Sequence, residues 1–294
     1  MLVDTQPATH QHMPASPEVR DQWVDSKLIG VLMDNAMPSL ISATLALPVM
    51  IYLMAGEVHN IALTVWTVLL LGVLVYRYRM IGTYRLRYDS TEGPLRMAFI
   101  ARYGWSWAAV GVFWGASIGL TYLQASMQTQ FVCGLVVLGH GLLSLTAFSA
   151  YLPVFRSYTN ALVISVLVGL MAPMLVGVVP TTGLKHLVSL VLLLLIFWWL
   201  LRIAGERLHQ VHRASFELQF SNQELIDSLT QQTRASLRAV ATKNRFLASA
   251  AHDLRQPVHS IGLYLDPIAT HLHGSENPTV TRALVGITQS WQVL

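Results

Sequence analysis

Hydrophobic and polar residues are arranged along this chain in long blocks rather than in a short alternation. Six apolar stretches are each long enough to cross roughly 30 Å of hydrocarbon as a helix. They cover about residues 35–55, 61–80, 98–122, 129–151, 158–179 and 185–203. Beyond them, apolar residues recur at steps of three and four, and no Gly or Pro occurs from Glu206 to Gln256. This pattern predicts one long helix. The chain is therefore expected to be all-α, with a transmembrane sensor domain over residues 28–203.

Composition supports a membrane protein, because 53% of the residues are hydrophobic, 12% are charged and the mean hydropathy is +0.50. Residues 1–27 are polar and carry no signal peptide, so we expect a cytoplasmic N-terminal tail. From Glu18 to Met33 the pattern becomes amphipathic, as expected of a helix at the membrane interface that leads into the first span.

The distribution of charge predicts the topology. The net charge is +4, and the arginines gather in alternate connections between the apolar stretches. The second and third stretches are joined by Arg77, Arg79, Arg85, Arg87, Arg96 and Arg102, and Arg156, Arg202, Arg207 and Arg213 mark the later cytoplasmic positions. The positive-inside rule then places both termini in the cytoplasm. Orientation in the membrane explains the excess of basic residues better than nucleic-acid binding does, so no nucleic-acid partner is expected.

The connections on the outer side are only a few residues long, so no outer sensing domain is expected. An input must then act within the bundle, as a lipophilic small molecule, a state of the membrane lipids or a buried protein partner. Polar and aromatic residues inside the apolar stretches are the candidate ligand contacts. They are His140, Trp105, Trp114, Gln130, Ser144 and Asn160. For His140, a hydrogen bond to a neighbouring helix is an equally good interpretation, and the tryptophans are also typical interfacial anchors.

No metal or redox site is predicted. Cys133 is the only cysteine, and the pairs His209 with His212 and His271 with His273 lack carboxylate or cysteine companions at suitable spacing.

Residues 204–235 follow a heptad pattern that predicts a coiled-coil signalling helix. The seam consists of Leu208, Val211, Ser215, Leu218, Asn222, Leu225 and Leu229. Past Leu229 the apolar set moves through Thr233 to Leu237, which is a stutter that changes coil winding locally. We consider two interpretations here, a switch that rotates the following helix and a static, imperfect coil.

The stretch from Asn244 to Leu265 reads as an amphipathic helix that presents His252 beside its apolar face. Pro257 lacks an N–H and crowds the carbonyl of Asp253, which predicts a bend just after the histidine. A turn with Gly274 as the stop precedes a second helix that starts at Pro278. Because a helical hairpin alone buries little, residues 236–294 predict a four-helix bundle formed by a homodimer.

The segment F-L-A-S-A-A-H-D-L-R-Q-P resembles the H-box of bacterial sensor histidine kinases, in the variant common among hybrid kinases. The resemblance implies that residues 236–294 are a dimerisation and phosphotransfer domain on the cytoplasmic side of the bacterial inner membrane. It implies that His252 is the phosphoacceptor and passes its phosphoryl group to an aspartate of a response regulator or receiver domain. Asp253 would orient or deprotonate the imidazole, and Gln256 replaces the Thr or Asn linked to phosphatase activity.

The chain departs from this family in one respect, since it contains no glycine-rich phosphate loop and no ATP-binding boxes. ATP and Mg are therefore expected to bind in a separate domain of a full-length kinase, and this chain alone should be inactive, with an incomplete phosphotransfer domain. The six-span architecture with small outer loops resembles quorum-sensing receptor kinases that recognise lipophilic autoinducers. A sensor of membrane state, and a non-enzymatic scaffold or transporter with a coiled-coil tail, are the alternatives.

Overall fold

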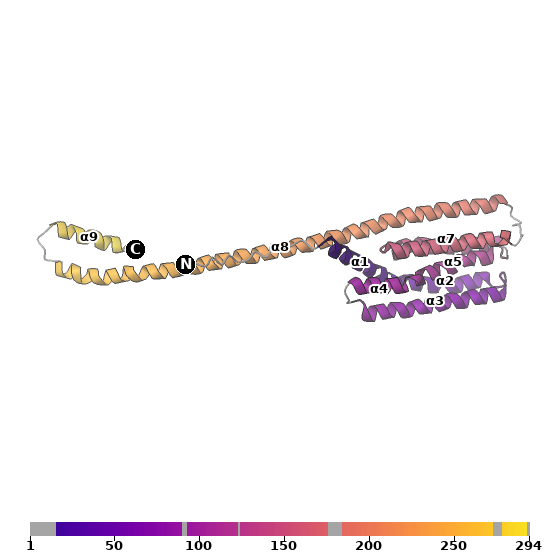
Figure 1. The fold of residues 1–294 in the computed structure, drawn as a ribbon, viewed down its shortest axis with the longest axis horizontal. Coiled ribbons are helices and arrows are strands. Elements are labelled where there is room, and N and C mark those ends of the chain that lie inside the picture. The colour runs from indigo at the N-terminus through magenta and orange to yellow at the C-terminus, as the bar shows by residue number, and fades with distance from the viewer. Residues whose placement is uncertain (1–15, 90–92, 123, 176–183, 273–277, 293–294) are drawn as a thin grey trace. The chain divides into compact units, whose positions relative to one another are not determined.

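The computed structural model describes residues 16–89, 93–122, 124–175, 184–272 and 278–292, and all regular structure in these ranges is α-helical (Figure 1). The helices are α1 (Pro17–Asp34), α2 (Ala36–Met54), α3 (Asn60–Arg87), α4 (Gly93–Tyr103), α5 (Trp105–Thr121), α6 (Met127–Phe148), α7 (Leu152–Leu175), α8 (Leu184–Leu272) and α9 (Pro278–Gln292). The predicted helical class is confirmed. The chain divides into two compact units, residues 1–223 and 224–294.

Among the described residues, five helical stretches are long and apolar enough to cross a membrane. They are Pro17–Met54, Asn60–Arg87, Met127–Phe148, Leu152–Met174 and Leu184–Leu263. The stretch 98–122, predicted as one span, is instead divided at Gly104 into α4 and α5. A Cβ at Gly104 would lie 2.7 Å from the Ile100 carbonyl oxygen, so this tight junction needs a residue without a side chain.

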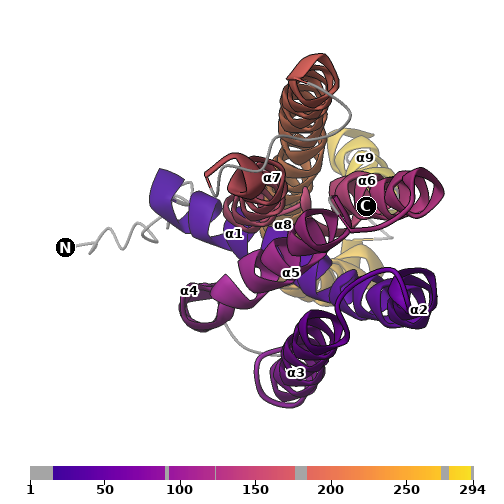
Figure 2. The same cartoon turned by 90° about the vertical axis from the view of Figure 1, so that its right-hand side faces the viewer.

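Helix α5 lies at the centre of the first unit, with α3, α6 and α7 around it (Figure 2). Its approach to α7 depends on glycines. A Cβ at Gly111 would lie 2.6 Å from the Tyr158 carbonyl oxygen, and one at Gly115 would lie 2.5 Å from the Leu162 carbonyl oxygen. The α5 and α7 backbones are therefore in close contact, as small residues allow between apolar helices.

The N-terminal segment Glu18–Met33 is helical as predicted, within α1, but α1 packs against protein. Val24, Leu28 and Leu32 are fully buried. Ser16 caps the helix, since its hydroxyl accepts a hydrogen bond from the Val19 N–H. The helix ends at Asp34, and Asn35 separates it from α2, which begins at Ala36.

The connections at one end of the bundle are held together by Glu57. Its carboxylate accepts hydrogen bonds from the Ser126 N–H at 2.8 Å and from the Ser126 hydroxyl at 3.1 Å. The bond from the Ser126 backbone lowers the pKa of Glu57 below its usual value. The Gln124 side chain accepts a hydrogen bond from the His59 N–H in the same region. The α2–α3 and α5–α6 connections are therefore adjacent.

Four of the six arginines predicted to join the second and third spans lie within α3 instead, namely Arg77, Arg79, Arg85 and Arg87. Helix α3 continues to Arg87, so Arg77 lies within it and is only 1% exposed. Its guanidinium lies 4.8 Å from the centre of the Trp107 ring and 5.7 Å from that of Phe148. The prediction for Arg77 was wrong because sequence position alone could not show that two aromatic side chains from α5 and α6 surround it.

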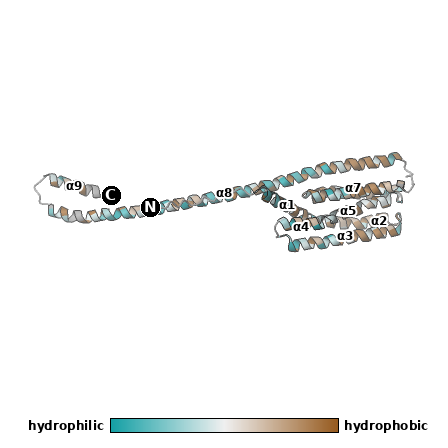
Figure 3. Cartoon of the chain, viewed as in Figure 1, coloured by the Kyte–Doolittle hydropathy of each residue, from teal (hydrophilic) through white to brown (hydrophobic). Residues whose placement is uncertain are grey.

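The long helix predicted after the last apolar stretch is confirmed, since α8 is continuous from Leu184 to Leu272 with Pro257 and Pro267 inside it. Figure 3 shows its composition change from hydrophobic at its start to mixed further along. The second helix of the predicted hairpin, α9, begins at Pro278 as expected. The turn around Gly274 lies outside the described residues.

Candidate functional site

His252 lies on α8 and is exposed to solvent, as is Gln256 one turn later. The Gln256 Nε2 atom lies 3.4 Å from the His252 Nε2 atom. Residues four apart on a helix share a face, so the amide is placed beside the ring by helix geometry alone. The histidine ring is thus accessible to a reactant and has one polar neighbour of its own chain.

Asp253 does not contact the imidazole in the same way, because adjacent residues on a helix point about 100° apart. Among the described residues no hydrogen bond or ion pair of the Asp253 carboxylate was found. Pro257 is accommodated without interruption of the helix, and the Ser260 hydroxyl donates to the Gln256 carbonyl oxygen at 3.0 Å. The bend predicted at Pro257 stays a prediction.

The apolar face beside His252 is exposed to solvent in the part of the chain that the structure describes. Phe246 and Leu254 are 70% and 68% exposed. A row of large apolar side chains in water is unfavourable and is typical of a helix that packs against another helix. The segment therefore offers both a reactive side chain and a surface for association.

Of the six predicted ligand contacts inside the bundle, the structure brings His140 and Trp114 together. The His140 ring stacks on Trp114, with the ring centres 4.0 Å apart, and its Nδ1 atom lies 3.0 Å from the Val136 carbonyl oxygen. The His140 Nε2 atom is buried with no hydrogen-bond partner among the described residues. The Ser144 hydroxyl donates to the Gly141 carbonyl oxygen at 2.6 Å. The expected hydrogen bond from His140 to a neighbouring helix is not seen among the described residues, since the Val136 carbonyl belongs to α6 itself and the contact with α5 is the stacking on Trp114.

Two further candidates are engaged elsewhere. The Asn160 side chain accepts a hydrogen bond from the Trp198 indole at 3.0 Å. Trp105 is 54% exposed and its ring lies 5.1 Å from that of Tyr76. Neither residue lines the cavity described below, and each instead contacts a side chain of another helix.

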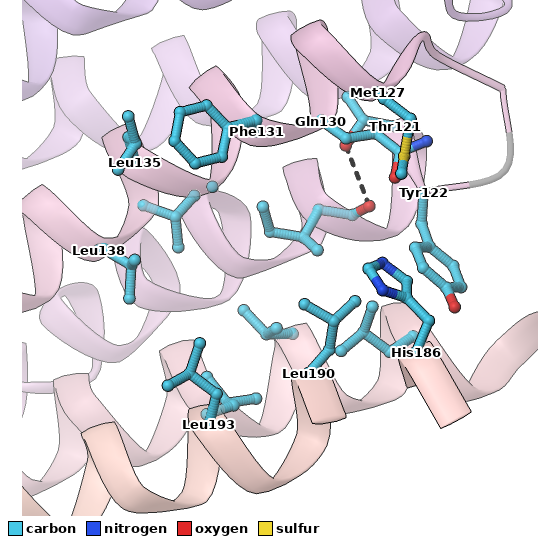
Figure 4. Close-up of a pocket in the computed structure, with 16 residues that line it drawn as sticks. Thr121, Tyr122, Met127, Gln130, Phe131, Leu135, Leu138, His186, Leu190 and Leu193 are labelled. Carbon is cyan, nitrogen blue, oxygen red and sulfur yellow. Dashed lines mark hydrogen bonds between the residues drawn. The ribbon is translucent and has the colours of Figure 1, made fainter. Parts of the chain in front are cut away.

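A cavity of about 350 Å³ lies between α5, α6, α7 and the first turns of α8 (Figure 4). Of the six predicted ligand contacts, only Gln130 lines it. The other polar lining residues are Thr121, Tyr122 and His186, and of these Thr121 and His186 were not predicted as site residues. The sequence did contain a signal for them. Thr121 and Tyr122 end the apolar stretch 98–122 and His186 begins the stretch 185–203, and a helical bundle places these two ends on the same side of the membrane.

A second signal that was overlooked is the spacing of Gly111, Gly115 and Gly119, a G-x-x-x-G-x-x-x-G pattern on α5. This pattern indicates close helix contact in membranes. It would have identified α5 as the central helix.

No cluster of His, Cys, Asp or Glu suited to a metal ion occurs among the described residues. No family model, curated protein or solved structure matches this chain.

Proposed function

We propose that this chain is the membrane-sensing and phosphoacceptor portion of a histidine kinase of a two-component system. The observation that carries the proposal is an exposed His252, with Gln256 beside its ring, on a helix that begins among the apolar helices. The H-box-like sequence around His252 supports the same assignment.

The proposed chemistry is nucleophilic. A neutral ring nitrogen of His252 attacks the γ-phosphorus of ATP, a P–N bond forms and the bond to ADP breaks. The phosphoryl group then passes to an aspartate of a response regulator or receiver domain, which restores the free imidazole. ATP and Mg bind in a separate domain of the full-length protein. Asp253 acts as the base or orienting group once a partner helix or that domain approaches it.

The proposed input is a lipophilic small molecule or a membrane property within the bundle, because the apolar helices provide the sensing surface. The proposal also includes a topology. The chain crosses the bacterial inner membrane six times, and both of its termini lie in the cytoplasm. In this arrangement α5, at 17 residues, is the short central span. Two chains associate through the exposed face of α8, so that His252 lies in a dimeric helical bundle.

The test is transfer of label from γ-labelled ATP in membranes that contain the full-length gene product. We expect acid-labile label in the wild type, its loss to background in His252→Gln, and its retention in His259→Gln. His259 is a fair control because it is an exposed histidine on the same helix.

Label that persists in His252→Gln, or that is lost equally in both variants, would contradict the assignment of His252. A complete absence of label from the full-length protein would favour a non-enzymatic scaffold or a transporter with a coiled-coil tail.

A further inference from the structure

The cavity between α5, α6, α7 and α8 is lined mainly by apolar side chains. Leu135 and Leu138 from α6 face Leu190 and Leu193 from α8 (Figure 4). Its volume of about 350 Å³ is in the range of small-molecule sites. At about 30 Å³ for a water-sized group, the space holds roughly a dozen non-hydrogen atoms. Its size and lining fit one short aliphatic chain.

The polar residues gather at one end of the cavity. Figure 4 shows Tyr122 and His186 side by side there, with Thr121 and Gln130 above them and Leu135, Leu138 and Leu193 toward the other end. Tyr122 is only 7% exposed, and its hydroxyl has no hydrogen-bond partner in the described part of the chain. A buried hydroxyl without a partner is costly, so a group that supplies one stabilises this end.

The charge of that group follows from the lining. The Gln130 amide nitrogen donates one hydrogen bond to the Ala125 carbonyl oxygen at 2.8 Å. The Gln130 oxygen, the Tyr122 hydroxyl and the His186 ring nitrogens also belong to this polar end, so it can both donate and accept hydrogen bonds. No Lys, Arg, Asp or Glu lines the cavity among the described residues. A neutral head group that donates and accepts hydrogen bonds suits this end better than an anion, because burying an unpaired charge costs far more.

The space exists because of where α6 and α8 touch. A Cβ at Gly141 would lie 2.9 Å from the Phe197 ring, so the two helices meet closely there. Gly134, about two turns nearer the start of α6, lines the cavity, and a Cβ there would contact nothing within 4 Å. The helices therefore separate toward Gly134, and the cavity is the gap between them.

We propose that this cavity binds one medium-length aliphatic chain with a neutral hydroxyl head group, with the head beside Tyr122 and His186. The molecule is a free amphiphile that enters from the bilayer. Such a ligand would bridge α6 to the first turns of α8, and α8 is the helix that carries His252. This regulatory consequence rests on the proposed function, whereas the binding itself does not.

The test uses the full 294-residue chain in phosphatidylcholine nanodiscs with a photoactivatable diazirine analogue of 1-decanol. We expect labelling of α6 and α8 residues around the cavity, mapped by mass spectrometry, that saturates and is displaced by unlabelled 1-decanol. Gly134→Leu fills the gap with a side chain and should reduce labelling roughly tenfold. Gly139→Leu is the matched control, because a Cβ there also meets nothing within 4 Å and Gly139 is an exposed residue of α6 outside the cavity lining.

The head-group assignment has its own measurement. In the wild type, 1-decanol should displace the probe better than decane. In Tyr122→Phe that advantage should fall by roughly two- to tenfold, which corresponds to one neutral hydrogen bond. An unchanged advantage would overturn the assignment of the head group to Tyr122.

Equal labelling of the wild type and a folded Gly134→Leu variant would overturn the site. If decanol does not compete, and a phospholipid instead co-purifies with the wild type and is lost from Gly134→Leu, the cavity holds a bilayer acyl chain and the free-ligand assignment fails. Neither readout uses ATP or His252. A failure of binding is therefore separable from a failure of the kinase assignment, which the full-length phosphorylation assay addresses.

Discussion

At the scale of single residues, glycines decide how closely the helices approach. Gly115 on α5 is the sharpest case, because its missing side chain would lie 2.5 Å from the Leu162 carbonyl oxygen and 2.7 Å from the Ser165 Cβ. Real Cβ atoms do not come so close to another backbone. By contrast, a Cβ at Gly72 on α3 would meet nothing within 4 Å. The same residue type is thus indispensable in one helix and replaceable in another.

We therefore predict that Gly115→Ala destabilises the bundle by about 1–3 kcal/mol, because α5 and α7 must separate to admit the methyl group. Gly72→Ala should be neutral or slightly stabilising, since alanine favours a helix over glycine by about 1 kcal/mol. Thermal unfolding in detergent, followed by circular dichroism, measures both. Equal shifts in melting temperature would show that the close α5–α7 contact does not limit stability.

At the scale of elements, α1 is attached to the part of α8 that follows the apolar stretch. The Arg213 guanidinium forms ion pairs with Asp21 at 2.9 Å and with Asp25 at 3.2 Å. The Trp23 ring lies between Phe216 and Phe220, with ring centres 6.5 and 5.4 Å away. Partly exposed ion pairs contribute about 0–1 kcal/mol each. The aromatic contact is therefore the larger contribution to this attachment.

Removing that contact should release α1. In Trp23→Ala, amide hydrogen exchange of α1 should become roughly tenfold faster or more, because burial of a large apolar side chain stabilises by about 1.5–3 kcal/mol. Trp105→Ala is the control, since Trp105 contacts Tyr76 rather than α1 or α8. Arg213→Gln should give a smaller acceleration than Trp23→Ala. If exchange in α1 is the same in all three variants, these contacts do not hold the helix.

At the scale of the whole molecule, the part of α8 beyond the apolar stretch carries large apolar side chains that are exposed in the single chain. Leu218, Leu225 and Leu229 are 65%, 58% and 53% exposed, and they follow the steps of three and four expected for a coiled-coil seam. Leu237 and Val240 continue the row with equally exposed side chains. A second copy of the chain would supply a matching surface, and the homodimer expected from the sequence stays a prediction.

Light scattering of the purified chain in detergent should therefore give the mass of a dimer. Leu225→Asp should weaken association roughly tenfold or more, because a charge is placed in the seam. Gln231→Asp adds the same charge outside the seam, about 160° around the helix from Leu229, and should leave the dimer intact. A monomeric wild type, or equal effects of the two substitutions, would remove the support for a dimer through this face.

The sequence by itself determined the helical class, the apolar stretches, the continuity of α8 and the placement of Gln256 beside His252. These features depend on local periodicity, on the absence of helix breakers and on the geometry of a single helix, and all of these can be read along the chain.

Only the tertiary structure decided which helices meet and what they enclose. It buried Arg77 between Trp107 and Phe148, stacked His140 on Trp114, and left a cavity whose polar end joins Tyr122 from beyond α5 to His186 at the start of α8. These outcomes depend on contacts between residues far apart in the chain. Such contacts are set by helix packing, and the periodicity of any one helix does not contain them.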